Sequence, residues 1–193
     1  MPAVPAVFID RDGTLSEEVG YVNHPGRLRL LPRSAEAVRL LNNAGVRAVV
    51  VTNQSGVARG YFSEEVVHAV NAKLVSELKA AGAFLDGLYV CFHHPREGVP
   101  PYRARCDCRK PKPGLLLRAA RELGLDLAAS YMVGDKFSDV AVGKRVGVIS
   151  ILVLTGYGLG EWEYRRSRWP CAPDHVAGDL LDAVQWILAR RQR

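Results

Sequence analysis

Ala6-Val7-Phe8-Ile9-Asp10-Arg11-Asp12-Gly13-Thr14 joins an apolar run to two aspartates, and it indicates both the fold of this chain and its chemistry. An apolar run that ends in polar residues predicts a buried strand over Ala6–Asp10. Two carboxylates, Asp10 and Asp12, follow closely, and Gly13 permits a tight turn after them. Such a pair can share a divalent cation, or one member can attack phosphorus while the other donates and accepts a proton. The alternative interpretation is an Asx turn at a strand end.

Strands and helices are predicted to alternate along the rest of the chain. Apolar, valine-rich runs predict strands, and runs with helical spacing that end at a glycine predict helices. We predict strands over Val46–Thr52, Leu85–Phe92, Tyr131–Val133 and Ile149–Leu154, and helices over Ser34–Asn43, from Ser63 to about Ala80, from Pro113 to near Gly124, and from Asp179 to about Arg190. This order is typical of an α/β fold, a Rossmann-like parallel sheet with helices on both faces.

Polar side chains recur where the predicted strands end. In such sheets ligands bind at the carboxyl ends of the strands, so these side chains are expected to converge on one site. Thr52 and Asn53 can donate hydrogen bonds to a phosphoryl group, and Lys110 can neutralise its charge. Asp135 adds a carboxylate for a hard cation such as magnesium. Asp139 either holds a metal-bound water or caps the following helix.

The composition is that of a globular protein. A chain of 193 residues with 48% hydrophobic and 24% charged residues is not disordered, and we expect one domain over residues 1–193. No apolar run approaches the length of a membrane span, and Met1–Val7 is too short for a signal peptide, so a cytoplasmic protein is expected. The net charge of +6 fits an anionic partner, although a solvated basic surface is the alternative. Nothing suggests an obligate interface, and a monomer is expected.

Three of the four cysteines are grouped with a histidine around a long segment rich in proline and arginine, Pro95–Pro111. Clustered cysteines in a cytosolic chain point to metal binding rather than to disulfides. Three thiolates and one imidazole fill a tetrahedral site with no open position, so the sequence predicts a structural zinc ion. Ordinary buried cysteines are the alternative, and His94 or Cys171 could replace His93. The proposed ligands are Cys91, His93, Cys106 and Cys108, on a loop over about residues 91–110.

The order of these groups resembles the four motifs of the haloacid dehalogenase superfamily of phosphohydrolases. The resemblance extends from Phe8 to about Gly156 and implies a haloacid dehalogenase-like fold. The chain lacks the inserted cap domain that many members use to close the site, so loops must do so here. The motif residues are Asp10 and Asp12, Thr52, Lys110, and Asp135 with Asp139.

The resemblance implies a role for each motif residue. Asp10 would be the nucleophile that forms an aspartyl-phosphate, and Asp12 the general acid and base. Thr52 and Lys110 would stabilise the transferred phosphoryl group. Asp10, Asp12 through its main-chain carbonyl, and Asp135 would hold magnesium.

Three further segments, residues 52–60, 91–95 and 106–114, resemble more narrowly a family of sugar bisphosphate phosphatases that act on a heptose destined for bacterial surface polysaccharides. This resemblance implies a small-molecule sugar bisphosphate as substrate, with neither nucleic acid nor membrane as partner. It also assigns substrate recognition to Arg109. The implied substrate-binding residues are Glu18, Val19, Gly20, Tyr21, Thr52, Asn53, Gln54, Ser55, Arg109, Lys110 and Lys136.

Three alternatives remain at this point. Histidinol-phosphate phosphatases resemble the chain and carry a similar zinc loop. They have a shorter gap than the twelve residues between His93 and Cys106 here, and an aspartate where this chain has Ser55. A polynucleotide 3′-phosphatase of the same superfamily fits the positive charge, but no nucleic-acid module is evident. A non-catalytic zinc module that binds nucleic acid leaves the carboxylates unexplained, because they repel phosphate unless a metal intervenes.

Overall fold

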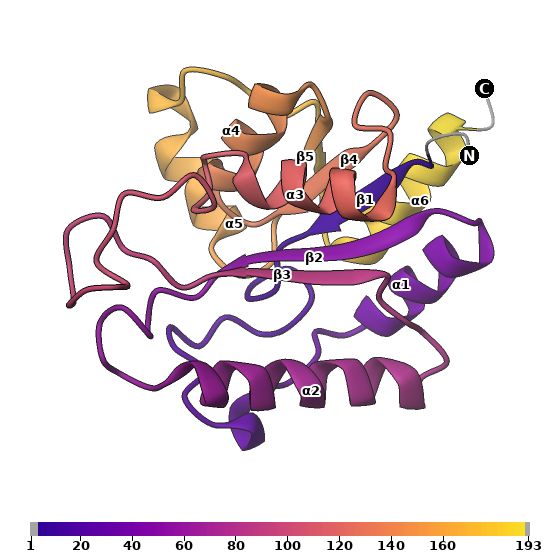
Figure 1. The fold of residues 1–193 in the computed structure, drawn as a ribbon. Helices are drawn as coiled ribbons and strands as arrows, with labels where there is room; N and C mark the ends of the chain where they lie inside the picture. The colour runs from indigo at the N-terminus through magenta and orange to yellow at the C-terminus, as the bar shows by residue number, and fades with distance from the viewer. Residues whose placement is uncertain (1–3, 192–193) are drawn as a thin grey trace.

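The computed structural model describes residues 4–191. Six parallel strands form a central sheet in the order β3-β2-β1-β4-β5-β6 (Figure 1). The two central strands are buried along their whole length, as expected when helices cover both faces of a parallel sheet. The strands are β1 (Ala6–Ile9), β2 (Arg47–Asn53), β3 (Gly87–Cys91), β4 (Tyr131–Gly134), β5 (Ile149–Val153) and β6 (His175–Ala177). The predicted α/β fold is confirmed.

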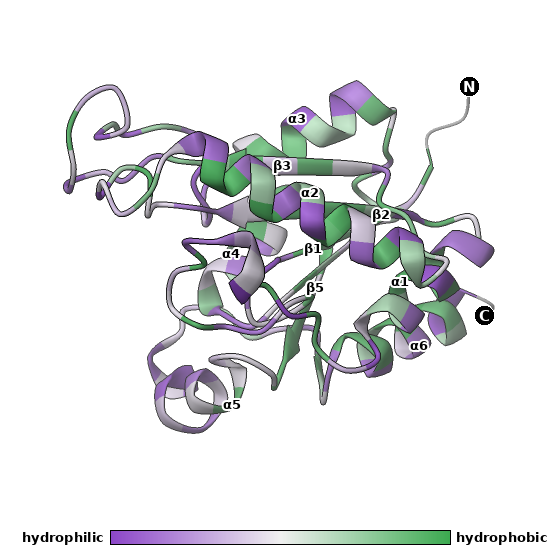
Figure 2. Ribbon diagram, turned by 90° about the horizontal axis from the view of Figure 1, so that it is seen from below, coloured by the Kyte–Doolittle hydropathy of each residue, from purple (hydrophilic) through white to green (hydrophobic). Residues whose placement is uncertain are grey.

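Helices cover the two faces unequally (Figure 1). Side chains alternate along β1, so that Val7 and Ile9 pack in one hydrophobic core and Ala6 and Phe8 in the other. Apolar residues of α1, α2 and α6 complete the first core, and those of α3 and α4 complete the second. In Figure 2 the strands at the centre are largely hydrophobic, whereas the helices alternate hydrophobic and hydrophilic residues. These helices are α1 (Ser34–Asn43), α2 (Glu64–Ala80), α3 (Gly114–Leu123), α4 (Phe137–Val146) and α6 (Leu180–Arg191).

The short elements near the C-terminus were not predicted. β6 has only three residues, two of them half-buried, so it carries no strand pattern. Before it, the chain forms three short helical turns, α5 (Gly158–Gly160), η2 (Glu161–Arg165) and η3 (Arg166–Arg168), and another turn, η1 (Pro25–Arg27), precedes α1. None of them is long enough to show a helical period.

Two irregular segments lie beyond the carboxyl ends of the strands (Figure 1). The segment between β3 and α3 contains no helix or strand, as predicted for Pro95–Pro111. The turns of α5, η2 and η3 form the other segment. Among residues 4–191, no helix is both long enough and apolar enough to span a bilayer.

Candidate active site

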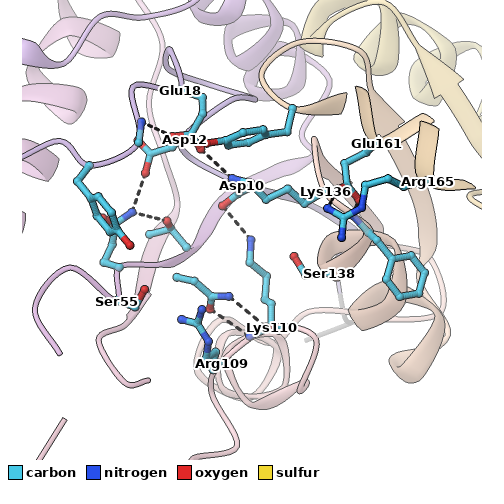
Figure 3. Close-up of a pocket in the computed structure, with 17 residues that line it drawn as sticks. Asp10, Asp12, Glu18, Ser55, Arg109, Lys110, Lys136, Ser138, Glu161 and Arg165 are labelled. Carbon is cyan, nitrogen blue, oxygen red and sulfur yellow. Dashed lines mark hydrogen bonds and ion pairs between the residues drawn. The ribbon is translucent and has the colours of Figure 1, made fainter. Parts of the chain in front are cut away.

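A cavity of about 550 Å³ opens at the carboxyl ends of the strands (Figure 3). Its lining side chains come from the loop after β1, the end of β2 and the loop after it, the segment after β3, the start of α4, and the turns around α5. Two predicted residues do not line the cavity: Asp135, which is fully buried, and Val19, which is 36% exposed. The predicted residues that line the cavity are Asp10, Asp12, Glu18, Gly20, Tyr21, Thr52, Asn53, Gln54, Ser55, Arg109, Lys110 and Lys136.

Three buried carboxylates meet at the base of this cavity. One oxygen from each of Asp10, Asp135 and Asp139 lies within 4.8 Å of the others. Burial, and then the charge of Asp10, raises the pKa of Asp135 to about 8, and the same two causes raise the pKa of Asp139. Within the described residues Asp135 Oδ1 has no hydrogen-bond partner, although it is buried. Crowded carboxylates with an unpaired buried oxygen fit a divalent cation that prefers oxygen ligands.

Two glycines allow the main chain to close around Asp135. Gly13 has a φ of +89° and Gly156 a φ of +57°, and a Cβ atom at either position would run into the Asp135 carboxylate. The Asp135 Oδ2 atom accepts a hydrogen bond from the main-chain nitrogen of Tyr157 at 2.9 Å. Asp135 is therefore fixed by main chain on both sides, so its carboxylate has little freedom to turn away.

Lys110 is the cation that pairs with two of these carboxylates, and Figure 3 shows its contact with Asp10. Its side chain is buried, and its ammonium lies 2.8 Å from Asp10 Oδ1, 2.6 Å from Asp139 Oδ1 and 2.8 Å from the carbonyl of Val51. Burial lowers the pKa of Lys110, but the two carboxylates outweigh it and leave the pKa raised, so the lysine is charged. Each of its three protons has an acceptor.

Asp139 has a dual role in this arrangement. Its Oδ2 atom accepts a hydrogen bond from the main-chain nitrogen of Lys136 at 3.2 Å, and so caps the start of α4. Its Oδ1 atom pairs with Lys110. The structure therefore supports the interpretation of Asp139 as a helix cap and adds the pairing with Lys110, which the sequence did not indicate.

The end of β2 organises the neighbouring groups. Asn53 donates from Nδ2 to the carbonyl of Lys110 and accepts from the nitrogen of Lys110 at Oδ1, both at 3.1 Å. This two-bond clamp ties the strand to the loop that carries the lysine. Gln54 Nε2 donates to Thr52 Oγ1 and to Asp12 Oδ2, both at 2.8 Å. Because the Thr52 hydroxyl accepts there, its own proton stays available to a ligand in the cavity.

Arg11 contacts a predicted site residue, although the sequence did not single it out. It is 1% exposed, and its guanidinium donates to both oxygens of Asp12, from Nε at 3.0 Å and from Nη2 at 2.8 Å. Its third nitrogen donates to Asn71 of α2 at 2.8 Å. The two hydrogen bonds from the Arg11 guanidinium fix the orientation of the Asp12 carboxylate. An arginine between two aspartates is ordinarily a surface residue, so the pattern gave no signal of burial.

The rim of the cavity carries further charged and aromatic groups. Lys136 Nζ lies 2.8 Å from Glu18 Oε2 and 4.7 Å from the centre of the Tyr157 ring. The unpredicted lining residues come from the irregular segment around α5 and from the start of α4, where no periodic signal marks them. They are Phe137, Ser138, Tyr157, Glu161 and Arg165. Arg165 is paired with Glu161 at 2.5 Å, and both approach from the side of the cavity away from Arg109 (Figure 3).

The four predicted zinc ligands come together behind this rim. The sulfurs of Cys91, Cys106 and Cys108 lie 3.0–3.6 Å apart, and His93 Nδ1 lies 3.4 Å from Cys108 Sγ. The four ligand atoms are within 4.8 Å of one another, and all four cysteines of the chain are free thiols. His94 is oriented differently, because its Nδ1 accepts from the main-chain nitrogen of Glu97. Soft ligands gathered around one point are compatible with zinc.

The parallel sheet has the strand order β3-β2-β1-β4-β5-β6. Aspartates follow β1, a threonine lies at the end of β2, and a buried lysine–aspartate pair lies beside them. These features together define a haloacid dehalogenase-like phosphatase. A family model described as HAD-hydrolase-like matches residues 107–183.

Named relatives match almost the whole chain. A D-glycero-D-manno-heptose-1,7-bisphosphate 7-phosphatase from Thermosynechococcus vestitus is 44% identical over 189 residues, 95% of each chain. D-glycero-beta-D-manno-heptose-1,7-bisphosphate 7-phosphatase from Escherichia coli (strain K12) is 46% identical over 187 residues, 96% of this chain and 94% of the relative. The crystal structure of D,D-heptose 1,7-bisphosphate phosphatase from B. bronchiseptica, complexed with magnesium and phosphate, is 30% identical, with a TM-score of 0.85 over 97% of this chain and 99% of that one. The chain therefore belongs to the D-glycero-D-manno-heptose 1,7-bisphosphate 7-phosphatase family.

Proposed function

We propose that this protein hydrolyses the 7-phosphate of D-glycero-D-manno-heptose 1,7-bisphosphate in a magnesium-dependent reaction, as a step towards nucleotide-activated heptose. The observation that carries the proposal is the buried cluster of Asp10, Asp135, Asp139 and Lys110 at the base of the cavity. Relatives that are 40–46% identical and are named for this reaction support the substrate.

The acidic cluster would hold the magnesium ion, through the carboxylates of Asp10 and Asp135 and the main-chain carbonyl of Asp12. The Asp12 carboxylate is already engaged by Arg11 and Gln54, which agrees with a main-chain contribution from this residue. When bound, magnesium neutralises charge on the phosphoryl oxygens of the substrate and on the crowded carboxylates.

Asp10 would attack phosphorus and form an aspartyl-phosphate, with loss of the sugar alkoxide. Asp10 Oδ1 is held by Lys110, which leaves the other carboxylate oxygen to face the cavity. The Lys110 ammonium and the free proton of the Thr52 hydroxyl then lie beside the position of the transferred group. Both can stabilise its negative charge without moving, because the ammonium is held by its acceptors and the Thr52 hydroxyl by the hydrogen bond that it accepts from Gln54.

Asp12 would donate a proton to the leaving alkoxide and later take one from the water that attacks the aspartyl-phosphate. In the structure its carboxylate is a hydrogen-bond acceptor for Arg11 and Gln54, which is the state that receives a proton in the second half of the reaction. Arg11 would be a positioning residue for this carboxylate.

Arg109 would bind the phosphate that is not transferred. Its guanidinium lines the cavity and is oriented by one hydrogen bond to the carbonyl of His93 at 3.2 Å. Because Arg109 and Lys110 directly follow Cys108, a structural zinc ion on Cys91, His93, Cys106 and Cys108 would anchor both cations. Glu18, Tyr21 and Lys136 line the remaining wall, where sugar hydroxyls would bind.

All residues of the proposed site come from one chain, so the proposal requires neither a second copy nor a second domain. It treats residues 1–193 as one catalytic unit that acts as a monomer. We place it in the cytoplasm, where free thiols remain reduced and available to zinc.

A phosphate-release screen tests the proposal. We would compare the heptose bisphosphate with other sugar bisphosphates, histidinol phosphate and a 3′-phosphorylated oligonucleotide, each with magnesium, and use Asp10→Asn as the matched inactive variant. The proposal expects the heptose bisphosphate to have the highest kcat/KM and Asp10→Asn to release no phosphate. A higher kcat/KM for histidinol phosphate or the oligonucleotide would contradict it.

A further inference from the structure

A second cavity, of about 580 Å³, adjoins the active-site cavity and shares only Arg109 and Lys110 with it. It lies between the segment after β3 and the C-terminal end of α4. Six of its ten lining residues are basic and none is acidic, in contrast to the active site, which four carboxylates line. The basic lining residues are Arg96, Arg105, Arg109, Lys110, Lys112 and Arg145.

Most of this positive charge is uncompensated. The ammonium of Lys110 is turned away, towards Asp10 and Asp139. Lys112 pairs at 3.3 Å only with Asp107, a side chain that is 93% exposed, and such a surface pair contributes little. Within residues 4–191, the ion pairs include none made by Arg96, Arg105, Arg109 or Arg145. Four guanidinium groups around one hollow repel one another until an anion binds.

We propose that this second cavity binds a small, multiply charged phosphate compound at a site distinct from the active site. Guanidinium groups pair with phosphate oxygens in a bidentate manner, and four of them suit more than one phosphate group. The cavity size lies within the range of small-molecule sites. No aromatic side chain lines it, so it lacks the stacking surface that a nucleic-acid strand would use.

The site binds its ligand without hydrolysing it. No carboxylate lines the cavity, so it contains neither a nucleophile of the Asp10 type nor oxygen ligands for a hard cation. Cys106 also lines the cavity but belongs to the proposed zinc site, and the basic residues of the lining support electrostatic recognition of an anion.

Arg109 couples the two cavities, and this part of the inference rests on the proposed function, in which Arg109 binds the phosphate that is not transferred. An anion in the second cavity competes for the same guanidinium. The compound bound there therefore raises KM for a bisphosphate substrate and changes KM for a monophosphate substrate much less. A phosphorylated compound would inhibit the enzyme in this way from the second cavity, through the arginine that both cavities share.

Isothermal titration calorimetry with inorganic pyrophosphate tests the site on zinc-loaded protein without added magnesium. Under these conditions the carboxylates of the active site repel the probe, whereas the second cavity has none. We expect one bound pyrophosphate per chain, and the double variant Arg105→Gln/Arg145→Gln to weaken binding by roughly tenfold or more. The matched control, Lys79→Gln/Arg121→Gln, removes the same charge from exposed positions outside the cavity and should retain the wild-type Kd.

A third variant separates the two cavities. Lys136→Gln removes a cation that lines only the active site, so it should leave pyrophosphate binding unchanged. Three results would each overturn the proposed site. They are no binding of pyrophosphate to the wild type, equal weakening of binding by the two double variants, and loss of binding in Lys136→Gln when Arg105→Gln/Arg145→Gln still binds. These outcomes do not depend on which substrate the enzyme hydrolyses.

The coupling has its own readout. With free magnesium held in excess, pyrophosphate should raise KM for the bisphosphate in the wild-type enzyme but not in Arg105→Gln/Arg145→Gln. Binding of pyrophosphate with no change in KM would refute the competition for Arg109.

Discussion

Replacing Lys110 by methionine is expected to lower the free energy of unfolding by about 3–5 kcal/mol at pH 8, the usual cost of removing one partner from a buried ion pair. Lys110 is 4% exposed, and its ammonium contacts Asp10, Asp139 and the carbonyl of Val51 within 2.8 Å. Methionine fills a similar volume but leaves all three acceptors without this donor. The cost arises mainly from two buried carboxylates that lose their cation.

The destabilisation should become smaller as the pH falls. Burial, together with the charge of Asp10, raises the pKa of Asp139, whereas the ammonium of Lys110 lowers it, so loss of the ammonium would raise this pKa further. A carboxyl whose pKa is raised in the folded state favours folding when it is protonated, and this stability is lost as the pH rises through the folded pKa. The stability deficit of Lys110→Met should therefore shrink as the pH falls below about 8.

Urea unfolding of zinc-loaded, magnesium-free protein would measure these differences, with the fluorescence of the three tryptophans as the signal. Lys112→Met is the matched control, because its side chain is 47% exposed and pairs only with an exposed aspartate. Equal destabilisation by the two variants, or a deficit in Lys110→Met that grows as the pH falls, would show that the Lys110 ion pairs do not stabilise the fold in this way.

Four further outcomes are expected. Asp12→Asn should lower kcat by roughly two to four orders of magnitude, as expected when a general acid is lost, while magnesium still raises Tm as in the wild type. A decrease in kcat of less than about tenfold in a stopped assay would argue against Asp12 as the general acid. Arg109→Ala should raise KM for a bisphosphate more than for a monophosphate, and equal increases would mean that it only supports its loop. Chelation of zinc should expose residues 95–110 to protease and reduce turnover while circular dichroism still reports the sheet; a protected loop with full activity would contradict this. Because burial raises the pKa of Asp135 to about 8, magnesium must displace a proton from this carboxyl below that pH. The rise in Tm on adding magnesium should therefore be larger at about pH 8.5 than at about pH 6. Equal rises in Tm at the two pH values in scanning fluorimetry would contradict this prediction.

The fold was predictable where local patterns are strong. The apolar runs that became β1, β2, β4 and β5 are fully or almost fully buried, so their composition reveals them directly. The edge strand β6 has three residues and partial burial, and it forms only because β5 offers a free edge. Tertiary context determines such an element, and no local pattern marks it.

The candidate site was likewise predictable only in part. Asp10, Asp12 and Thr52 stand at strand ends, and the topology of a parallel sheet brings such positions together. The burial of Arg11 depends on Asn71, which lies sixty residues away on α2. The two hydrogen bonds of Asn53 depend on Lys110, which lies fifty-seven residues away on a loop. Contacts between distant segments leave no periodic trace in the sequence, so the partners of these side chains could not be predicted from it.

The most direct test of the central claim is a phosphorus NMR measurement on the reaction with D-glycero-D-manno-heptose 1,7-bisphosphate and magnesium. We expect the 7-phosphate signal to be converted to inorganic phosphate while the 1-phosphate signal is retained, and we expect Asp10→Asn to leave both signals unchanged. Loss of the 1-phosphate, or conversion by Asp10→Asn at the wild-type rate, would contradict it.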